Sequence, residues 1–219
     1  MSTATLTQPP RTASSVVRTV GILTIVGAVI GIVGGTVLAF VPPGPGAVEG
    51  TFAYPLDPAG HALAEASFIL NHLLLGAGLL VATLSPEAGT RPGRLGGWIA
   101  LAGMAALTVA EAWAIPLAGA AYPSDETAGI DVLYGVSSML LGVGLVLLGI
   151  GIARAPRSPG APRWHRWIVL VLGIMVFAVV TPGLMLGFTG GRLALVAWQV
   201  AWAAFGVAIV QAANRAGRR

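Results

Sequence analysis

Long apolar runs alternate with short breaks rich in Pro, Gly and charged residues along most of the chain. Each of the six runs has about 20 residues, enough for a helix to cross a hydrocarbon core about 30 Å thick. The pattern therefore predicts an all-α fold, an integral membrane bundle of six transmembrane helices in one domain, residues 16–213. The predicted helices cover residues 16–40, 61–84, 97–117, 132–153, 167–187 and 193–213.

Polar segments flank this predicted domain. Residues 1–15 are rich in Ser, Thr and Pro, which predicts a disordered N-terminal tail, and residues 214–219 form a basic C-terminal tail. The first run follows arginines, as the apolar region of a signal peptide does. It is longer than the usual apolar region of about 7–15 residues, and no small-x-small cleavage site follows it, so we expect a retained first helix.

Charge is scarce and unevenly placed. Only 9% of the residues are charged, whereas soluble domains carry about 25%, so a water-soluble fold fits poorly. All 12 basic residues are arginines, and only Arg192 lies outside the tails, the start of the first run and the connections that follow the second and fourth runs. Such segments stay in the cytoplasm, so both termini are expected to be cytoplasmic. We therefore expect a multi-pass protein of the bacterial inner (plasma) membrane that contacts the lipid bilayer and does not bind nucleic acid, despite its formal net charge of +4.

One local pattern occurs twice. Residues 73–80 and 139–146 are Gly-spaced apolar segments, each is followed by a connection rich in Arg, Pro and Gly, and the next run opens with Trp-Ile. This pattern resembles small polytopic membrane proteins of high-GC bacteria, a group with no assigned activity. The resemblance covers the second to fifth predicted helices and implies the style of the fold but no chemistry.

The second run carries ionisable side chains although it is long enough to cross a bilayer. At about 100° per residue, Glu65 and His72 lie within about 40° of His61 around the helix axis. Ionisable side chains of membrane helices face the bundle interior or a water-filled space. This face of the second helix is therefore expected to point inward, although His61 is close enough to the helix end to be simply solvated.

Polar groups of other runs fall at a similar depth. Counted at about 1.5 Å per residue from the ends opposite the arginines, Glu65 lies about 6 Å deep, and Glu111 and Gln199 lie about 9 Å deep. His72 lies about 16 Å deep. The coincidence predicts a polar cavity in the outer leaflet, walled by the second, third, fifth and sixth helices. Its expected ligand-binding residues are Glu65, His72, Glu111, Tyr134 and Gln199.

Helix breakers and one long connection are expected to shape this cavity. Pro116 and Pro182 should end or kink the third and fifth helices near its level. Residues 181–183, Thr-Pro-Gly, are expected about 8 Å deep and are counted with the polar groups there. The connection 41–57 is the longest on that side, so it either covers the cavity or serves only as a Pro-stiffened link.

Two nearby carboxyl groups in a region of low dielectric do not both ionise readily, so one of Glu65 and Glu111 is expected to hold a proton. Such a group can serve as a proton site for transport or as a general acid. In a purely structural alternative, Glu65–His72 and Glu111–Gln199 are hydrogen-bonded pairs that fix the helix register.

Three functions therefore stay open. The first is binding or transport of a small apolar or cationic molecule in the cavity. The second is an intramembrane enzyme, an acid-catalysed isomerase or cyclase acting on a lipid or isoprenoid, with Glu65 and Glu111 as catalytic residues. The third is an accessory membrane subunit without chemistry of its own.

Several other chemistries have no support in the sequence. The chain has no cysteine, and no phosphate loop, nucleophile elbow or HExxH motif occurs. His61 and His72 lie about 16 Å apart along a helix, too far to bind one ion. We therefore expect neither a metal site nor a cofactor.

Small residues form a stripe on the first helix. Gly27, Gly31 and Gly35 are spaced four apart, so another helix can approach this face closely. The neighbour is expected within the bundle, with a homo-oligomer or a partner subunit as the alternative.

Overall fold

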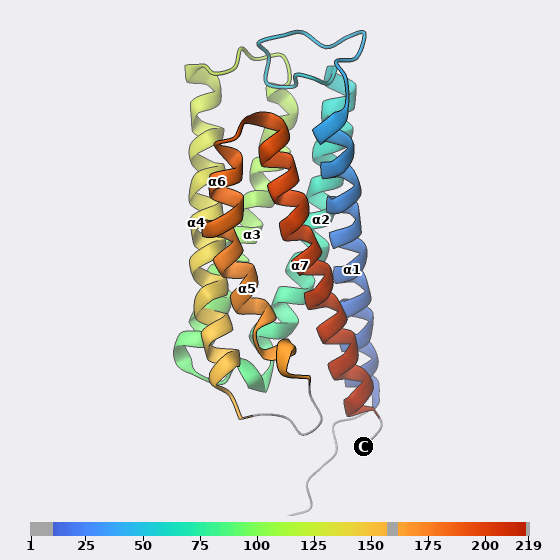
Figure 1. Ribbon diagram of the computed structural model, residues 1–219, viewed down its shortest axis with the longest axis vertical. Coiled ribbons are helices and arrows are strands. Elements are labelled where there is room, and N and C mark those ends of the chain that lie inside the picture. Colours follow the sequence, from blue (N-terminus) through green and yellow to red (C-terminus); the bar gives the residue numbers. More distant parts are fainter. Residues whose placement is uncertain (1–10, 157–161, 218–219) are drawn as a thin grey trace, which may run out of the picture.

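The computed structural model describes residues 11–156 and 162–217, and its long helices run along one axis as a bundle (Figure 1). The predicted all-α fold is thus confirmed for the described ranges. In chain order the elements are α1 (Arg11–Phe40), α2 (Pro58–Leu84), η1 (Pro86–Ala88), α3 (Arg91–Ala114), η2 (Ile115–Leu117), α4 (Asp125–Arg154), η3 (Arg163–Arg166), α5 (Ile168–Met175), η4 (Val176–Val180), α6 (Thr181–Leu184) and α7 (Gly187–Ala216).

The two ends of the bundle differ. One end, called the arginine end below, carries the start of α1, the end of α7 and the connections α2–α3 and α4–α5 (Figure 1). The opposite loop end carries the connections 41–57 and 118–124 and the turn between α6 and α7. In Figure 1 this turn falls short of the loops that join α1 to α2 and α3 to α4.

Five helices are long and apolar enough to cross a membrane, which is the pattern of a multi-pass membrane protein. They have 27 or 30 residues and a mean hydropathy between 1.6 and 2.4. The fifth predicted span is apolar but shorter, Ile168–Leu184. It ends early because Gly187, with φ of 78°, turns the chain into α7.

A π-helical turn accommodates Pro182. In a regular α-helix its ring would press on the carbonyl four residues earlier and leave that carbonyl unbonded. Instead, the Thr181 N–H donates to Val176 O across the π turn η4, and the Thr181 hydroxyl donates to the same oxygen at 2.8 Å. Pro182 then lies in the first turn of α6, where a missing N–H costs nothing. The predicted break at Pro182 is thus a change of helical register, and the helix ends two residues later.

The predicted tails are partly helical. Residues 11–15 belong to α1, and residues 214–216 belong to α7. Both differences extend a membrane helix by about one turn, which polar residues at a bilayer surface permit. Residues 1–10 and 218–219 lie outside the described residues.

Neighbouring helices form a ring. α1 packs on α2, α2 on α3, α3 on α4 and α4 on α5, and α7 closes the ring against α1 while α5 and α6 pack on α7. The contact between α3 and α4 is especially close, because a Cβ at Gly96 would lie 2.5 Å from Leu147 Cβ. A Cβ at Gly103 would lie 2.6 Å from the Leu141 nitrogen. Glycine lets these two backbones touch.

The glycine stripe of α1 is used within the chain. A Cβ at Gly31 would lie 2.5 Å from Gln199 Cδ, and one at Gly35 would lie 2.8 Å from Val196 Cγ2, both on α7. A Cβ at Gly27 would lie 2.8 Å from Leu74 Cβ on α2. These contacts agree with packing inside the bundle, and association with another subunit through the stripe stays a prediction.

The centre of the ring is solid in the half near the arginine end. Leu75, Leu79 and Leu145 are completely buried there. The Trp198 and Trp202 rings meet edge to face at 5.6 Å, and Trp198 Nε1 donates to Leu172 O at 3.0 Å. This packing blocks the axis of the bundle toward the arginine end.

His165 ties η3 to the end of α7. Arginine has only donors, so Arg215 Nη2 donates to His165 Nδ1 at 3.0 Å, and His165 Nε2–H donates to Gln211 Oε1 at 2.8 Å. The ring is therefore neutral. Burial lowers the pKa of His165, the hydrogen bond to Gln211 opposes this shift, and the charge of Arg215 adds to it.

We expect the protein to lose a small part of its stability as the pH falls below 6.5, the ordinary pKa of histidine. The folded-state pKa of His165 is lowered, so below that value the unfolded chain binds more protons than the folded chain and the free energy of unfolding decreases. Thermal unfolding in detergent, followed on both sides of this pH, checks the expectation. The unfolding temperature of the His165→Gln variant should depend less on pH. Equal pH dependence in the variant and the unchanged protein would contradict the expectation.

Candidate functional site

A cavity of about 990 Å³ lies inside the ring at the loop end. Its wall comes from α1, α2, α3, α4, η4, α6, α7 and the connections 41–57 and 118–124. The sequence had suggested four helices as walls, so α1 and α4 are additions. All five predicted ligand-binding residues line the cavity: Glu65, His72, Glu111, Tyr134 and Gln199.

Local breaks in two helices place His61 at this cavity. Asp57 caps α2 by accepting from the Gly60 N–H at 2.6 Å, and Pro58 opens the helix. On the facing helix, Pro116 ends α3 as predicted and a 3₁₀ turn follows. The Ala118 N–H turns to Ile115 O, so Ala114 O is free to accept from His61 Nε2 at 3.1 Å. His61 is therefore buried and bonded, and the expectation that it is simply solvated is wrong.

The two predicted carboxyl groups meet at the inner wall. Glu65 and Glu111 are only 5% and 8% exposed, and the two side chains interact electrostatically. Among the described residues no donor reaches Glu65 Oε2. Glu65 Oε2 is thus a buried oxygen without a hydrogen-bond partner, in a residue that lines the cavity.

Side chains from α2 and α4 surround this carboxyl pair. The Tyr134 hydroxyl donates to Glu111 Oε2 at 2.8 Å, and His72 Nδ1 lies 3.9 Å from Glu111 Oε1. On the other side, His61 Nδ1 lies 3.6 Å from Glu65 Oε1. The result is a cluster of two imidazoles, two carboxyls and a phenol, in which the phenol–carboxyl contact is a hydrogen bond.

An amide pair lies deeper on the same wall. Asn71 Nδ2 donates to Gly27 O at 2.7 Å and to Gln199 Oε1 at 3.3 Å, and Gln199 Nε2 donates to Asn71 Oδ1 at 3.2 Å. The structural pairs suggested by the sequence were wrong, because Gln199 bonds Asn71 and Glu111 bonds Tyr134. The sequence reasoning missed Asn71. The sequence feature that could have identified it is an amide side chain within the apolar run 61–84.

The connection 41–57 covers the cavity and is held by backbone hydrogen bonds. Phe52 N–H donates to Ala120 O at 2.9 Å, and Tyr122 N–H donates to Gly50 O at 2.8 Å. The Phe52 ring meets the His61 ring edge-on at 5.8 Å. The lid that the sequence suggested is therefore present as part of the wall.

A second acidic group lies beside this cover. The Tyr122 hydroxyl donates to Asp131 Oδ1 at 3.4 Å, and burial together with the Asp131 carboxylate raises the pKa of Tyr122. Both residues line the cavity and are exposed. Leu184 and Phe188 on the α6–α7 turn also line it, and they are 54% and 45% exposed. These exposed lining residues mark the mouth between α4 and the short α6–α7 turn.

Arg192 on α7 also lines the cavity, and the sequence reasoning did not count it among the site residues. Its guanidinium carbon lies 5.4 Å from the centre of the Phe68 ring and 5.2 Å from that of Phe188. Its signal was visible, since it is the one arginine placed at the loop end.

Residues 181–183 do not join the polar groups of the cavity, contrary to expectation. Thr181 and Pro182 are exposed, and the Thr181 hydroxyl is used by Val176 O. Gly183 is buried against Ala194 on α7. The π turn rotates this segment outward, so the fifth span contributes Val176, Val180 and Leu184 instead.

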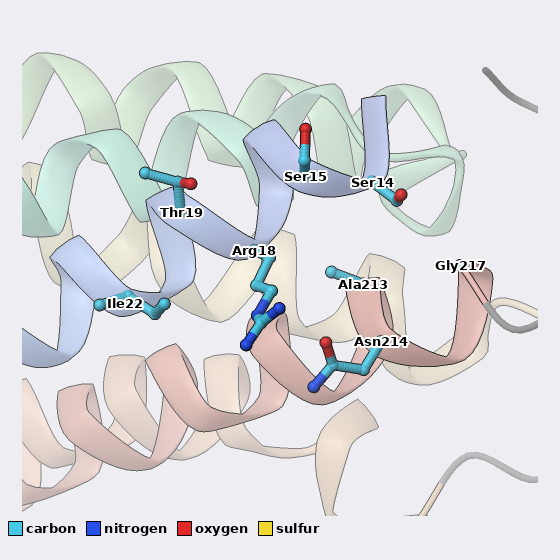
Figure 2. Close-up of a pocket in the computed structure, with 8 residues that line it drawn as sticks. All are labelled: Ser14, Ser15, Arg18, Thr19, Ile22, Ala213, Asn214 and Gly217. Atoms are coloured by element: carbon cyan, nitrogen blue, oxygen red, sulfur yellow. The ribbon is translucent and has the colours of Figure 1, made fainter. Parts of the chain in front are cut away.

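A separate polar pocket of about 630 Å³ lies at the arginine end between α1 and α7. Figure 2 shows Arg18 extending from α1 toward Asn214 on α7, with Ser15 and Thr19 along the same stretch of α1. This pocket lies at the start of α1, whereas the cavity lies at the loop end of the bundle. The two are therefore independent.

Comparisons add no relative: no family model, no curated protein and no solved structure matches the chain. The resemblance to small polytopic proteins of high-GC bacteria therefore stays a prediction. Within the described ranges, no group of three or more His, Asp or Glu side chains has the geometry to hold a metal ion.

Proposed function

We propose that the protein is a multi-pass protein of the bacterial inner membrane, with both termini in the cytoplasm, that binds a small solute in the loop-end cavity. The orientation is supported by the arginines, since 11 of the 12 lie toward the arginine end. With that orientation, the cavity lies in the outer leaflet and opens away from the cytoplasm.

The buried carboxyl pair is the observation that carries this proposal. A charged group at the centre of a membrane helix costs about 2.5–3.5 kcal/mol on insertion scales, so such groups persist where they have a role. Glu65 and Glu111 are buried, and both line the cavity. A cationic group of the solute offsets this cost, and an apolar part fits against Leu107, Leu141 and Val176.

Transport is the natural extension of this binding role. The cavity has its mouth toward the loop end, and the packed Leu75, Leu79 and Trp202 separate it from the arginine end. A carrier would need a second conformation in which this packing opens. The π turn η4 also lines the cavity, and single π turns inside helices are frequent at functional sites.

An intramembrane enzyme is the second candidate, favoured by the hydrogen bond between Tyr134 and Glu111. The phenol keeps Glu111 oriented beside Glu65, and a general acid needs a carboxyl that is held in place. The substrate would be a lipid or isoprenoid entering through the apolar mouth. An accessory subunit without chemistry of its own has less support, because Glu65 lines a cavity of about 990 Å³.

Identification of molecules that copurify with the protein tests the proposal. We expect a small molecule in the protein purified in a maltoside detergent, and at least a tenfold loss of it in Glu65→Gln and Glu111→Gln, about the effect of one lost hydrogen bond to a charged group. Mass spectrometry after liquid chromatography measures this. A carrier or binder returns one compound, whereas an isomerase or cyclase returns two compounds of equal mass and different retention.

The exposed Glu126→Gln variant on α4 is the matched control and should keep the molecule. Thermal unfolding of each variant separates the two roles of the carboxyls. Loss of the molecule with unchanged unfolding supports a binding site. Unfolding of both cavity variants, or equal molecule content in all proteins, would overturn the proposal.

A further inference from the structure

Arg192 has unused hydrogen-bond donors in the cavity. A guanidinium has five N–H donors, and in the described part of the chain none of those of Arg192 makes a hydrogen bond or an ion pair. Its contacts are the faces of Phe68 and Phe188, which hold its plane without using the N–H groups. A partly buried guanidinium in this state is ready for an anionic group.

Arg192 and the carboxyl pair lie at one level across the cavity. α2 and α7 both run from the loop end to the arginine end, and the Asn71–Gln199 pair joins them at a common height. Glu65 precedes Asn71 by six residues, which is about 9 Å. Arg192 precedes Gln199 by seven residues, which is about 10 Å. Glu65 and Arg192 both line the cavity, and among the described residues no ion pair joins Arg192 to either carboxyl.

The first turn of α7 strengthens the positive side of this site. Gly187 and Thr189 in that turn line the same wall as Arg192. The N–H groups of a first helical turn carry partial positive charge and favour anions. The loop-end wall of α7 therefore attracts a negative group, while the wall of α2 and α3 attracts a positive one.

We propose that the solute is a zwitterionic amphiphile, whose amine is held by Glu65 and Glu111, whose phosphate or carboxylate is held by Arg192, and whose apolar chain leaves through the mouth. This inference rests on the proposed function and names its ligand class. The guanidinium fork matches the two oxygens of a phosphate or carboxylate. A volume of about 990 Å³ is far larger than such a head needs, and the exposed Leu184 and Phe188 give the chain an apolar exit.

Binding of four defined probes to the full chain in maltoside detergent tests the inference. The probes are lysophosphatidylethanolamine, the primary alkylamine of equal chain length, the lysophosphatidic acid of equal chain length, and free phosphoethanolamine. Native mass spectrometry gives the bound fraction during titration. We expect the first probe to bind about tenfold more tightly than the alkylamine, because it adds charged hydrogen bonds to Arg192.

Variants of Arg192 test whether this residue causes the preference for lysophosphatidylethanolamine over the alkylamine. Arg192→Gln should remove the preference without weakening alkylamine binding, because the loss of a nearby positive charge does not disfavour a cation, and Arg192→Lys, which keeps the charge without the fork, should retain part of the preference. Arg154→Gln at the arginine end is the matched control and should behave as the unchanged protein. Thermal unfolding without probe shows that each variant is folded. If Arg192→Gln fails to fold, the comparison of probes on the unchanged protein and on Arg192→Lys decides.

The outcomes separate this inference from the proposed function. Equal affinity for the alkylamine and the zwitterion overturns the zwitterionic ligand and leaves the cationic site standing. If neither the alkylamine nor lysophosphatidylethanolamine binds, both the zwitterionic ligand and the cationic site are overturned. Tighter binding of free phosphoethanolamine than of its lyso form overturns the apolar chain and indicates a water-soluble zwitterion.

Discussion

Gly144→Val is expected to destabilise the bundle by about 3 kcal/mol or more, or to prevent its folding, because the new side chain has no space. A Cβ at Gly144 would meet the Ala100 nitrogen and would lie 2.6 Å from Gly96 O, both backbone atoms of α3. Backbone atoms cannot rotate away as a side chain can, so α3 and α4 would have to separate along their whole contact. Thermal unfolding in detergent, with size-exclusion chromatography to detect aggregation, measures the effect.

Gly135→Val on the same helix is the matched control. A Cβ at Gly135 has nothing within 4 Å, so the same substitution adds a side chain to open space. We expect an unfolding temperature equal to or above that of the unchanged protein, because Val also has a higher helix propensity than Gly. Equal losses in both variants would show that the contact between α3 and α4 is not the cause.

The sequence predicted the depth of the site residues well, because depth follows from counting along helices of known length. The apolar runs locate the helix ends to within a few residues, and each residue adds about 1.5 Å. Glu65 and Glu111 were therefore expected at one level, and the structure brings them together. The inward face of α2 followed in the same way from the helical period, which groups His61, Glu65 and His72.

The sequence could not predict which side chains pair across the cavity. Depth leaves the rotation of each helix about its axis free, and rotation decides whether Gln199 faces Glu111 or Asn71. The glycines of α1 set this rotation by letting α7 approach, so that Gln199 lies against Gly31. The pairing is a product of packing between segments far apart in the chain, and no local pattern contains it.

Backbone adjustments were equally hidden. Pro182 predicts a disturbance but not its kind, and only the π turn before it rotates residues 181–183 out of the cavity. Arg192 was visible as the exception to the charge pattern. Its position facing α2 depends on where α7 starts, and Gly187 fixes that start through its positive φ of 78°.

Asn71→Leu is expected to cost about 1–3 kcal/mol of stability, because it leaves the Gln199 amide buried without its partner. Asn71 is completely buried and links α2 to Gly27 on α1 and to Gln199 on α7. Gln199→Met, which keeps the length of the side chain, should cost a similar amount. If the two residues act as a pair, the double variant costs less than the sum, with a coupling of about 0.5–1.7 kcal/mol.

The same comparison of single and double variants tests whether Glu65 and Glu111 serve helix register or ligand binding. Helix register needs polar contacts between spans, and the Asn71–Gln199 pair supplies such contacts between α1, α2 and α7. If the cycle shows coupling in thermal unfolding, and Glu65→Gln and Glu111→Gln leave unfolding unchanged, the register belongs to the amides and the carboxyls are left for a ligand. Additive amide variants combined with strongly unfolding carboxyl variants would reverse this assignment, since the carboxyls would then hold the helices in place.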